Sequence, residues 1–414
     1  RNAVKLGVAT ARPSALDANA TAVVRYAPDD DDAFLAELDR ALLGGGQASE
    51  TTEALAGLLR DGGEDIVIVW GERIGASAAA RLLRIAQRLG LDRLGAGLLQ
   101  IPTGANGRGL REAGAVPDAG PGYELLDQAG RGAADIGEAL AAGELTALHL
   151  FQTDPVRDQP DRALWEDAMH SAALVVAHAN VLTEGLREHA NVIFPAESHA
   201  EKEGTVVHPD GRLQRLRIAV AHPGEVRPGW WVLAEVARLV GTDLGVERSA
   251  DAFEQLVADV PVYAGLTLDA IAGHGIRWPE RAQVAAFDAS HKEPLGLPPA
   301  PVPVTTPAPS PHPDGDAVFR LGTYRPVWAA PECEISPALK FLVPEQAVEL
   351  SPEDAQRLGI GDGDGVQVAA NGTRLQVTAA IRTGVPAGSA FLAEGIATDS
   401  ANALTEPLIE VHKA

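Results

Sequence analysis

The chain has 414 residues, of which 57 are acidic and 34 basic, so its formal net charge is −23 and its pI is about 4.8. Such an acidic chain lacks the positive surface that nucleic-acid phosphates or anionic lipids require, and we expect neither among its partners. Its single cysteine, Cys333, excludes an internal disulfide and a Cys₄ metal site built by this chain alone.

Neither the ends nor the apolar runs of the chain show targeting or membrane segments. No signal peptide is recognisable, and no apolar run approaches the roughly 18 residues of a transmembrane helix, so we predict no direct membrane insertion. The sequence begins at Arg1, without an initiator methionine, and Met169 is its one methionine. We therefore expect it to be a fragment of a longer protein.

The first strand and helix that the sequence predicts clearly lie between residues 66 and 90. Residues 66–70 form a continuous apolar, β-prone run that ends before Gly71. Residues 78–89 follow with helical spacing of apolar side chains, and Gly90 is a suitable residue to stop the helix. This pair predicts one strand–helix unit.

Similar strand and helix patterns alternate as far as residue 240. Apolar runs predict strands at 148–151, 174–177 and 191–194, and helical spacing occurs at 161–170 and 230–240. Alternation of this kind predicts a Rossmann-like α/β region with a parallel sheet and crossover helices. The glycine-dense stretch 104–117 is not expected to form regular structure.

A proline-rich segment separates this region from the rest of the chain. Nine of the twenty residues at 294–313 are proline, and such a composition gives an extended, semi-rigid chain that cannot bury a core. We therefore predict an α/β region at 1–293, a linker at 294–316 and a second domain at 317–414.

Short strands and tight turns characterise the last hundred residues. The run 347–350 predicts a strand, Ser351 and Pro352 are typical of a helix start, and Gly359 ends that helix. The run 366–381 predicts a β-hairpin that turns at Asn371-Gly372, because Asn-Gly suits the tightest hairpin turns. The glycines of 361–365 precede a strand rather than a helix, so they predict a turn and not a phosphate loop.

Residues 183–212 combine a short buried strand with closely spaced polar residues. Pro195 ends the strand, a charged loop contains Glu201 and Glu203, and tight turns are predicted at Gly204-Thr205 and at 209–211. Loops that follow buried strands are where α/β proteins place ligand contacts.

Histidines and carboxylates are frequent near this segment. The spacing of the four histidines fits no common zinc pattern, so we predict that they are solvated loop residues. They are His189, His199, His208 and His222. We make the same prediction for the three carboxylates Glu197, Glu201 and Glu203, as parts of a charged, solvated loop.

The ordered residues of 183–212 resemble a signature of the molybdopterin oxidoreductase superfamily. The matching positions are Thr183, Glu184, Ala190, Val192, Pro195, Ala196, Glu201, Gly204, Thr205, Gly211 and Arg212, whereas Gly185, Asn191 and His208 depart from the pattern. The stretch 104–117 resembles a family loop through Asn106, Gly109, Gly114 and Pro117. The resemblance implies an α/β region of the molybdopterin oxidoreductase type, followed by a six-stranded double-psi β-barrel like the family's dinucleotide-binding domain.

The resemblance also implies a set of site residues. Thr323 and Arg325 match a family Thr-x-Arg that meets the pterin dinucleotide, and the other candidates lie at matching positions. The full set of vestigial pterin-dinucleotide positions is Thr183, Glu184, Gly204, Thr205, Thr323, Arg325 and Asn402. The set contains no catalytic residue and no metal ligand, because Cys333 does not match the family's molybdenum ligand.

Within the superfamily, residues 201–205 resemble the large iron–sulfur protein of bacterial NADH–quinone oxidoreductase, respiratory complex I. That resemblance implies a scaffold that is not catalytic alone, binds no cofactor and adjoins the other peripheral-arm subunits on the cytoplasmic side of the inner membrane. Transfer of electrons from NADH through FMN and iron–sulfur clusters to quinone would belong to the parent complex, with the clusters in a missing N-terminal part.

Two alternatives stay open at this stage. The chain could be part of a molybdenum enzyme of the formate dehydrogenase or nitrate reductase type, in which case it would bind molybdopterin guanine dinucleotide. It could also be a binding module without a redox role.

Overall fold

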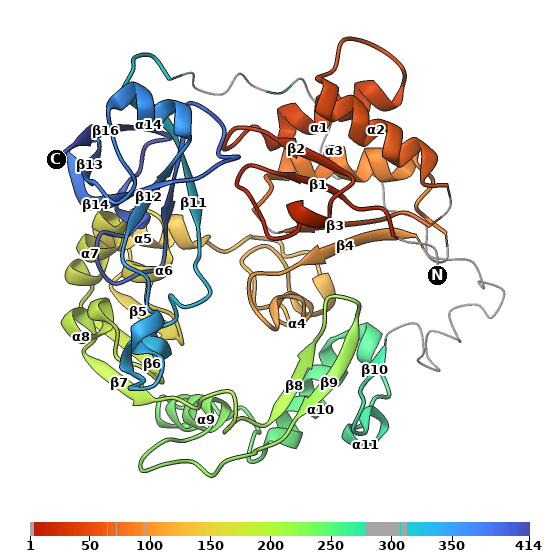
Figure 1. The fold of residues 1–414 in the computed structure, drawn as a ribbon. Coiled ribbons are helices and arrows are strands. Elements are labelled where there is room, and N and C mark those ends of the chain that lie inside the picture. The colour runs from red at the N-terminus through yellow and green to blue at the C-terminus, as the bar shows by residue number, and fades with distance from the viewer. Residues whose placement is uncertain (1–3, 64, 72, 94–95, 278–306, 308–312) are drawn as a thin grey trace. The chain divides into compact units, whose positions relative to one another are not determined.

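The structure, a computed structural model, divides into two compact units. Figure 1 shows the chain as a ribbon. It describes residues 4–63, 65–71, 73–93, 96–277, 307 and 313–414. Three stretches of chain, 1–98, 156–163 and 294–414, make up unit 1, and the stretches 99–155 and 164–293 make up unit 2. Most of the predicted linker at 294–316 lies outside the described residues, so that domain division stays a prediction.

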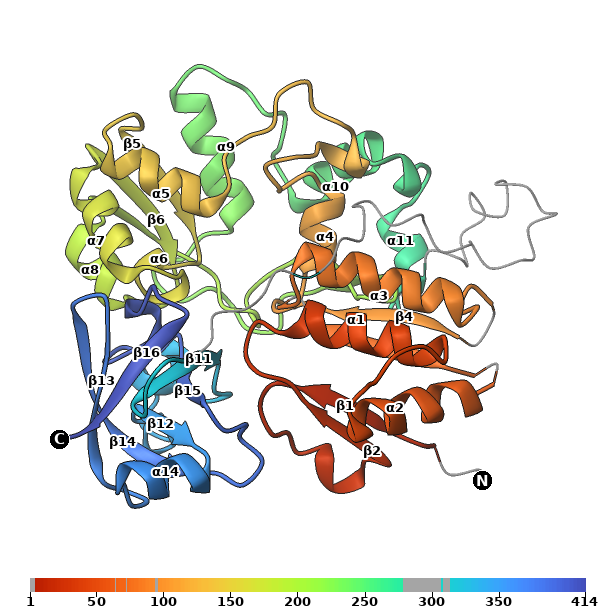
Figure 2. The same ribbon diagram turned by 90° about the horizontal axis from the view of Figure 1, so that it is seen from above.

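The N-terminal part of unit 1 is an α/β layer. Strands β1 (Gly7–Thr10) and β2 (Ala22–Arg25) pair in parallel, and β3 (Val67–Gly71) pairs with β4 (Gly97–Ile101). Helices α1 (Asp31–Leu42), α2 (Glu50–Asp61) and α3 (Ala76–Arg88) cover these strands (Figure 2) and share an apolar core with them. Strand β3 and helix α3 confirm the predicted strand–helix unit, and Gly90, with φ of 64°, follows the helix end.

The C-terminal part of unit 1 is a closed six-stranded barrel with the strand order β11-β15-β12-β14-β13-β16. Two neighbouring pairs, β11 with β15 and β12 with β14, are parallel, and the other ladders are antiparallel. The strands are β11 (Val318–Tyr324), β12 (Ala347–Leu350), β13 (Gly365–Ala370), β14 (Thr373–Ile381), β15 (Ser389–Ala393) and β16 (Leu408–Lys413). The predicted double-psi barrel fold is confirmed.

The helix and the hairpin that the sequence predicts in this region are both present in the barrel. Helix α14 (Pro352–Leu358) begins after Ser351, whose Oγ accepts a hydrogen bond from the backbone N–H of Asp354 at 3.1 Å. It ends at Gly359, which has φ of 65°. Strands β13 and β14 form the predicted hairpin, and inward side chains from all six strands fill a single apolar core.

Unit 2 contains a three-stranded parallel sheet. Strand β6 (Leu174–Ala179) lies between β5 (Ala147–Phe151) and β7 (Val192–Pro195), and α5 (Ala133–Ala141), α7 (Arg162–Ser171) and α8 (Glu184–His189) accompany them in the chain. The predicted parallel sheet with intervening helices is confirmed.

A second sheet of unit 2 is antiparallel and was not predicted. Its strands are β8 (Gly204–Val207), β9 (Arg212–Leu216) and β10 (Ile276–Arg277), and they share a core with α10 (Ser249–Asp259) and α11 (Leu268–Ile271). The predicted turn at Gly204-Thr205 is wrong, because these residues begin β8. Gly204 has φ of 148°, which favours glycine, and the tight turn that joins β8 to β9 has Gly211 at φ of 87°.

The glycine-dense stretch 104–117 also differs from expectation, since helix α4 (Gly107–Glu112) lies in it. Tertiary contacts explain why a helix forms despite its two glycines. Asn106 Oδ1 accepts a hydrogen bond from the backbone N–H of Val207 at 2.9 Å, and the buried carboxylate of Glu112 accepts one from the hydroxyl of Tyr263. These contacts hold both ends of the helix in unit 2.

The remaining regular segments are short, apart from α9. They are η1 (Asp17–Asn19), η2 (Pro121–Tyr123), α6 (Pro155–Asp158), α9 (Gly229–Leu239), η3 (Pro261–Tyr263), α13 (Pro331–Ile335), η5 (Lys340–Leu342) and η6 (Ala401–Ala403). In the described part of the chain, no helix combines the length and the apolar character needed to cross a membrane.

Candidate functional site

The predicted site residues divide between the two units. Thr323, Arg325 and Asn402 belong to unit 1: Thr323 lies in strand β11 of the barrel, Arg325 follows that strand, and Asn402 lies in η6. Thr183, Glu184, Gly204 and Thr205 belong to unit 2.

The barrel group lies where two parallel strands end together. Thr323 and Tyr324 at the end of β11 pair with Leu392 and Ala393 of β15, and the N–H of Glu394 donates to the Tyr324 carbonyl at 2.9 Å. Because β11 and β15 run in the same direction, the segments that follow them leave the barrel at the same end. Arg325 and Gly395 are therefore neighbours, although 70 residues separate them in sequence.

Gly395 brings Arg325 and Asn402 close to each other. Its N–H donates to Asn402 Oδ1 at 2.8 Å, and a Cβ added to it would lie 3.2 Å from Arg325 Nε. Arg325 Nη2 donates to Asp158 Oδ1 at 3.0 Å, and Asn402 Nδ2 donates to the Gln159 carbonyl at 2.9 Å. The segment that contains helix α6 thus fixes both side chains.

Thr323 is held by Arg73, a residue that the sequence did not mark. Arg73 Nη1 donates to the Thr323 carbonyl at 3.0 Å and to its hydroxyl at 3.2 Å, and the same guanidinium pairs with Glu394. The Thr323 hydroxyl accepts from Arg73, so its own proton can still be donated. The structure thus brings the three predicted barrel residues together around the 394–395 backbone, with Arg73 and Asp158 as additional members.

The Thr183–Glu184 pair lies at the start of helix α8, directly beyond strand β6. The backbone N–H groups of Gly185 and Leu186 donate to Asp154 Oδ2 at 2.9 and 3.3 Å. The start of this short helix is therefore already capped by a carboxylate and does not offer these two donors to an anion. The Thr183 hydroxyl oxygen is buried and has no hydrogen-bond partner among the described residues.

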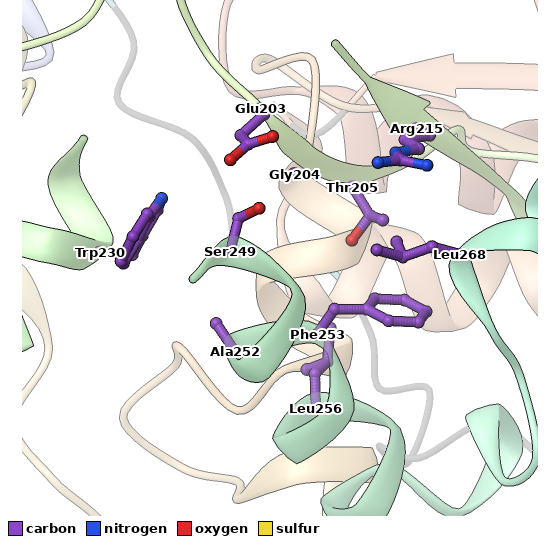
Figure 3. Close-up of a pocket in the computed structure, with 10 residues that line it drawn as sticks. All are labelled: Glu203, Gly204, Thr205, Arg215, Trp230, Ser249, Ala252, Phe253, Leu256 and Leu268. Atoms are coloured by element: carbon purple, nitrogen blue, oxygen red, sulfur yellow. The ribbon is translucent and has the colours of Figure 1, made fainter. Parts of the chain in front are cut away.

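Gly204 and Thr205 line a different feature of unit 2, a pocket of about 150 Å³ (Figure 3). Its other lining residues come from the loop before β8, from β9, α9 and α10, and from Leu268 at the start of α11. They are Glu203, Arg215, Trp230, Ser249, Ala252, Phe253, Leu256 and Leu268.

Sequence reasoning missed a pair of titratable residues in unit 2. Glu197 is 6% exposed, its Oε1 lies 2.9 Å from His222 Nε2, and its Oε2 accepts from the N–H of Gly229 at 3.2 Å. The sequence predicted solvated side chains for both Glu197 and His222, and that prediction is wrong. The position of Glu197 directly after strand β7 and the apolar Ala196 was the one available signal. No local sequence pattern identifies a partner 25 residues away.

Other polar candidates have no comparable partners. His208 pairs with Asp210 at 2.8 Å at the β8–β9 turn, where both are exposed. Cys333 is buried in α13. Among the described residues, no group of three or more His, Cys, Asp and Glu side chains has the arrangement of a metal site.

Comparison with known proteins adds family information. A family model described as molybdopterin oxidoreductase matches residues 64–239, and one described as molybdopterin dinucleotide binding domain matches residues 333–414. The NADPH-Fe(3+) oxidoreductase subunit alpha of Geobacter sulfurreducens is 25% identical over 98% of this chain and 51% of its own length. The F420-dependent formate dehydrogenase 2 subunit alpha of Methanococcus maripaludis is 26% identical over 76% of this chain and 50% of its own length.

A solved structure has a related fold. Acetylene hydratase from Pelobacter acetylenicus superposes with a TM-score of 0.58 over 99% of this chain and 74% of its own, at 10% identity. The chain spans about half the length of the two curated relatives named above. Together with the barrel and the α/β region, the two family matches lead to one conclusion: the chain belongs to the molybdopterin oxidoreductase superfamily and carries its dinucleotide-binding domain.

Proposed function

We propose that this chain is the dinucleotide-binding portion of a molybdenum oxidoreductase of the formate dehydrogenase type. The observation that carries the proposal is the grouping of Thr323, Arg325 and Asn402 around the 394–395 backbone at one end of the barrel. The two family models support it, and so do relatives named as formate dehydrogenases.

The residues present fit a pterin dinucleotide. The guanidinium of Arg325 is 41% exposed and has a planar fork of donors that suits a phosphate or a fused heterocycle. Asn402 uses its amide to hold the loop in place, so its role would be to position Gly395 and Arg325.

The cofactor and the protein side chains would have different roles. When bound, the pterin dinucleotide with its metal would supply the redox chemistry. Arg325 and Thr323 would hold and orient the dinucleotide, and the ion pairs of Arg73 with Glu394 and of Arg325 with Asp158 would keep those donors in place.

The complex I assignment receives no comparable support. The relatives named above are a formate dehydrogenase and an NADPH-Fe(3+) oxidoreductase subunit, and neither name refers to complex I. The peripheral-arm partners and the location beside the inner membrane therefore stay predictions. A second candidate function comes from the relative that aligns with 98% of this chain. In that case the chain would be part of the alpha subunit of an NADPH-linked oxidoreductase.

The test is cofactor content. The protein, produced in a host that makes the pterin dinucleotide, should contain molybdenum or tungsten together with a pterin that fluoresces after oxidation. Arg325→Ala should lower the pterin content severalfold, because it removes the exposed planar donor. Arg374→Ala, an equivalent change at an exposed position of the β13–β14 hairpin, should leave it unchanged.

Electron donors separate the two candidates. Reduction of a dye by formate would support the formate dehydrogenase type, and reduction by NADPH alone would favour the second candidate. Protein that contains neither pterin nor metal, in a host whose other pterin enzymes are loaded, would contradict both.

A further inference from the structure

Apart from Gly204 and Thr205, the residues that line the pocket of unit 2 in Figure 3 are not among the predicted dinucleotide positions. Its volume of about 150 Å³ is that of a cavity that admits a molecule the size of benzene. Phe253, Leu256 and Leu268 give it an apolar floor, and Phe253 is only 7% exposed. A ligand of this pocket therefore carries a small apolar group.

Two opposite charges line the pocket, one on strand β9 and one directly before strand β8. Arg215 is directly opposite Thr205 in the antiparallel register, and Glu203 lies two residues before Thr205. Glu203 and Arg215 are thus placed to approach the two charged groups of one small molecule.

The described part of the chain neutralises neither charge. Among the described residues, Glu203 and Arg215 form no ion pair and no side-chain hydrogen bond, although both are half-buried. A half-buried charge without a partner costs free energy unless a ligand or water compensates it. In Figure 3 the two side chains flank the pocket from different sides and do not meet.

A third unsatisfied group points to the same pocket. The indole Nε1 of Trp230 is buried and has no hydrogen-bond acceptor among the described residues. Figure 3 places the Trp230 ring on the side opposite Arg215, with its nitrogen at the end nearer Glu203. An unpaired buried N–H costs about 1–3 kcal/mol, so a hydrogen-bond acceptor, from a bound molecule or from water, would be favoured there.

Together, one cation and one anion without partners among the described residues, beside an apolar floor, match a small zwitterion. We propose that this pocket binds a free α-amino acid with a branched aliphatic side chain, such as leucine. The ligand carboxylate pairs with Arg215, the ammonium group pairs with Glu203, and the side chain rests on Phe253, Leu256 and Leu268. This site is additional to the proposed redox function and does not depend on it.

Equilibrium dialysis of the full-length protein against radiolabelled L-leucine tests the proposal. Leucine should bind, and Arg215→Gln and Glu203→Gln should each weaken binding by about tenfold or more, since each removes one charge-assisted contact. Arg217→Gln and Glu225→Gln make the same changes at exposed positions outside the pocket and should leave the affinity unchanged.

Analogues keep the test decisive even if a variant folds poorly. 4-Methylpentanoate lacks the ammonium group and 3-methylbutylamine lacks the carboxylate, so both should bind the unmodified protein about tenfold more weakly than leucine. No leucine binding at millimolar concentration, or binding of either analogue as strong as that of leucine, would overturn the proposal. Loss of leucine binding leaves pterin content unaffected, so failure here and failure of the proposed function are distinguishable.

Discussion

Two histidines on the parallel sheet of unit 2 should make the stability of the protein depend on pH. His149 of β5 and His178 of β6 have their Nε2 atoms 2.9 Å apart, so one ring must donate and the other accept. His178 also stacks on Phe151, with ring centroids 4.3 Å apart. Burial lowers the pKa of both histidines, and for His178 the neighbouring His149 lowers the pKa further.

The sign of the pH effect follows from these lowered pKa values. In the unfolded chain both rings titrate near the ordinary histidine pKa of about 6.5, so on acidification the unfolded state takes up protons first. We therefore expect the free energy of unfolding to be fully present above about pH 6.5 and to fall as the pH drops through the lowered folded-state pKa values.

Urea unfolding at about pH 7.5 and about pH 5.5 measures this effect, and it avoids the region below about pH 4 where carboxylates contribute. The loss of stability between the two pH values should shrink in His178→Phe, which keeps an aromatic ring in the stack. It should persist in His199→Gln, which changes an exposed loop histidine. An equal loss in the His178→Phe protein would count against the histidine pair as its source.

At the scale of an element, helix α14 illustrates how a cap connects to the barrel. Ser351 Oγ donates to Asp354 Oδ2 at 2.6 Å and accepts from the Asp354 N–H. The same carboxylate accepts from the N–H of Gly388 at 2.9 Å and from Arg357 at 2.6 Å. The cap therefore also orders the segment that leads into β15.

Removal of the cap should destabilise the barrel. Ser351→Ala removes the acceptor of the Asp354 N–H and a donor to the Asp354 carboxylate, which is 1% exposed. We therefore expect the free energy of unfolding to fall by about 1–2 kcal/mol. Chemical denaturation monitors this loss. Ser171→Ala, at an exposed position at the end of α7, should change stability by less than about 0.5 kcal/mol. Equal effects of the two substitutions would refute the capping argument.

Elements with local signals were predictable from the sequence, and those defined by distant contacts were not. Helix α14 carries its cap, its first-turn proline and its terminal glycine within nine residues, and the β13–β14 hairpin carries its Asn-Gly turn. Helix α4 contains two glycines and exists because Asn106, Val207 and Tyr263 hold its ends. Likewise, Gly204-Thr205 looks like a turn in sequence, but pairing with β9 makes it a strand.

The same distinction explains the candidate site. The Thr-x-Arg at 323–325 and Asn402 were identified by resemblance to a family, and their proximity follows from the parallel pairing of β11 and β15. Arg73 and Asp158, which hold Thr323 and Arg325, are 250 and 167 residues away from them, and no sequence pattern links residues at such separations.

At the scale of the whole molecule, unit 1 is assembled from stretches of chain that lie far apart in sequence. Arg12, in the loop after β1, forms two hydrogen bonds with Glu349 of β12, at 2.6 and 2.7 Å, across a separation of 337 residues. Its guanidinium also lies 3.8 Å from the centroid of the Tyr324 ring. Arg320 of β11 makes a similar link to Asp30, just before helix α1. Paired charges thus connect the N-terminal α/β layer to the barrel.

The Arg12–Glu349 pair should dominate this connection, because Glu349 is 5% exposed and a buried carboxylate needs its partner. Arg12→Ala would leave it with Arg382, whose Nε is 3.7 Å away. We expect the free energy of unfolding to fall by about 2–4 kcal/mol. This is less than the cost of removing one partner of a fully buried ion pair, because Arg12 is 36% exposed and Arg382 remains.

A double substitution separates the buried charge from simple loss of contact. Adding Glu349→Gln to Arg12→Ala should recover part of the stability, because no unpaired charge then remains buried. Arg60→Ala breaks the exposed Arg60–Glu53 pair and should cost less than about 1 kcal/mol in urea unfolding. The opposite result is that the two substitutions are additive, so that Glu349→Gln costs as much in the Arg12→Ala protein as it does alone. The two residues would then act independently, and their pair would not join the α/β layer to the barrel.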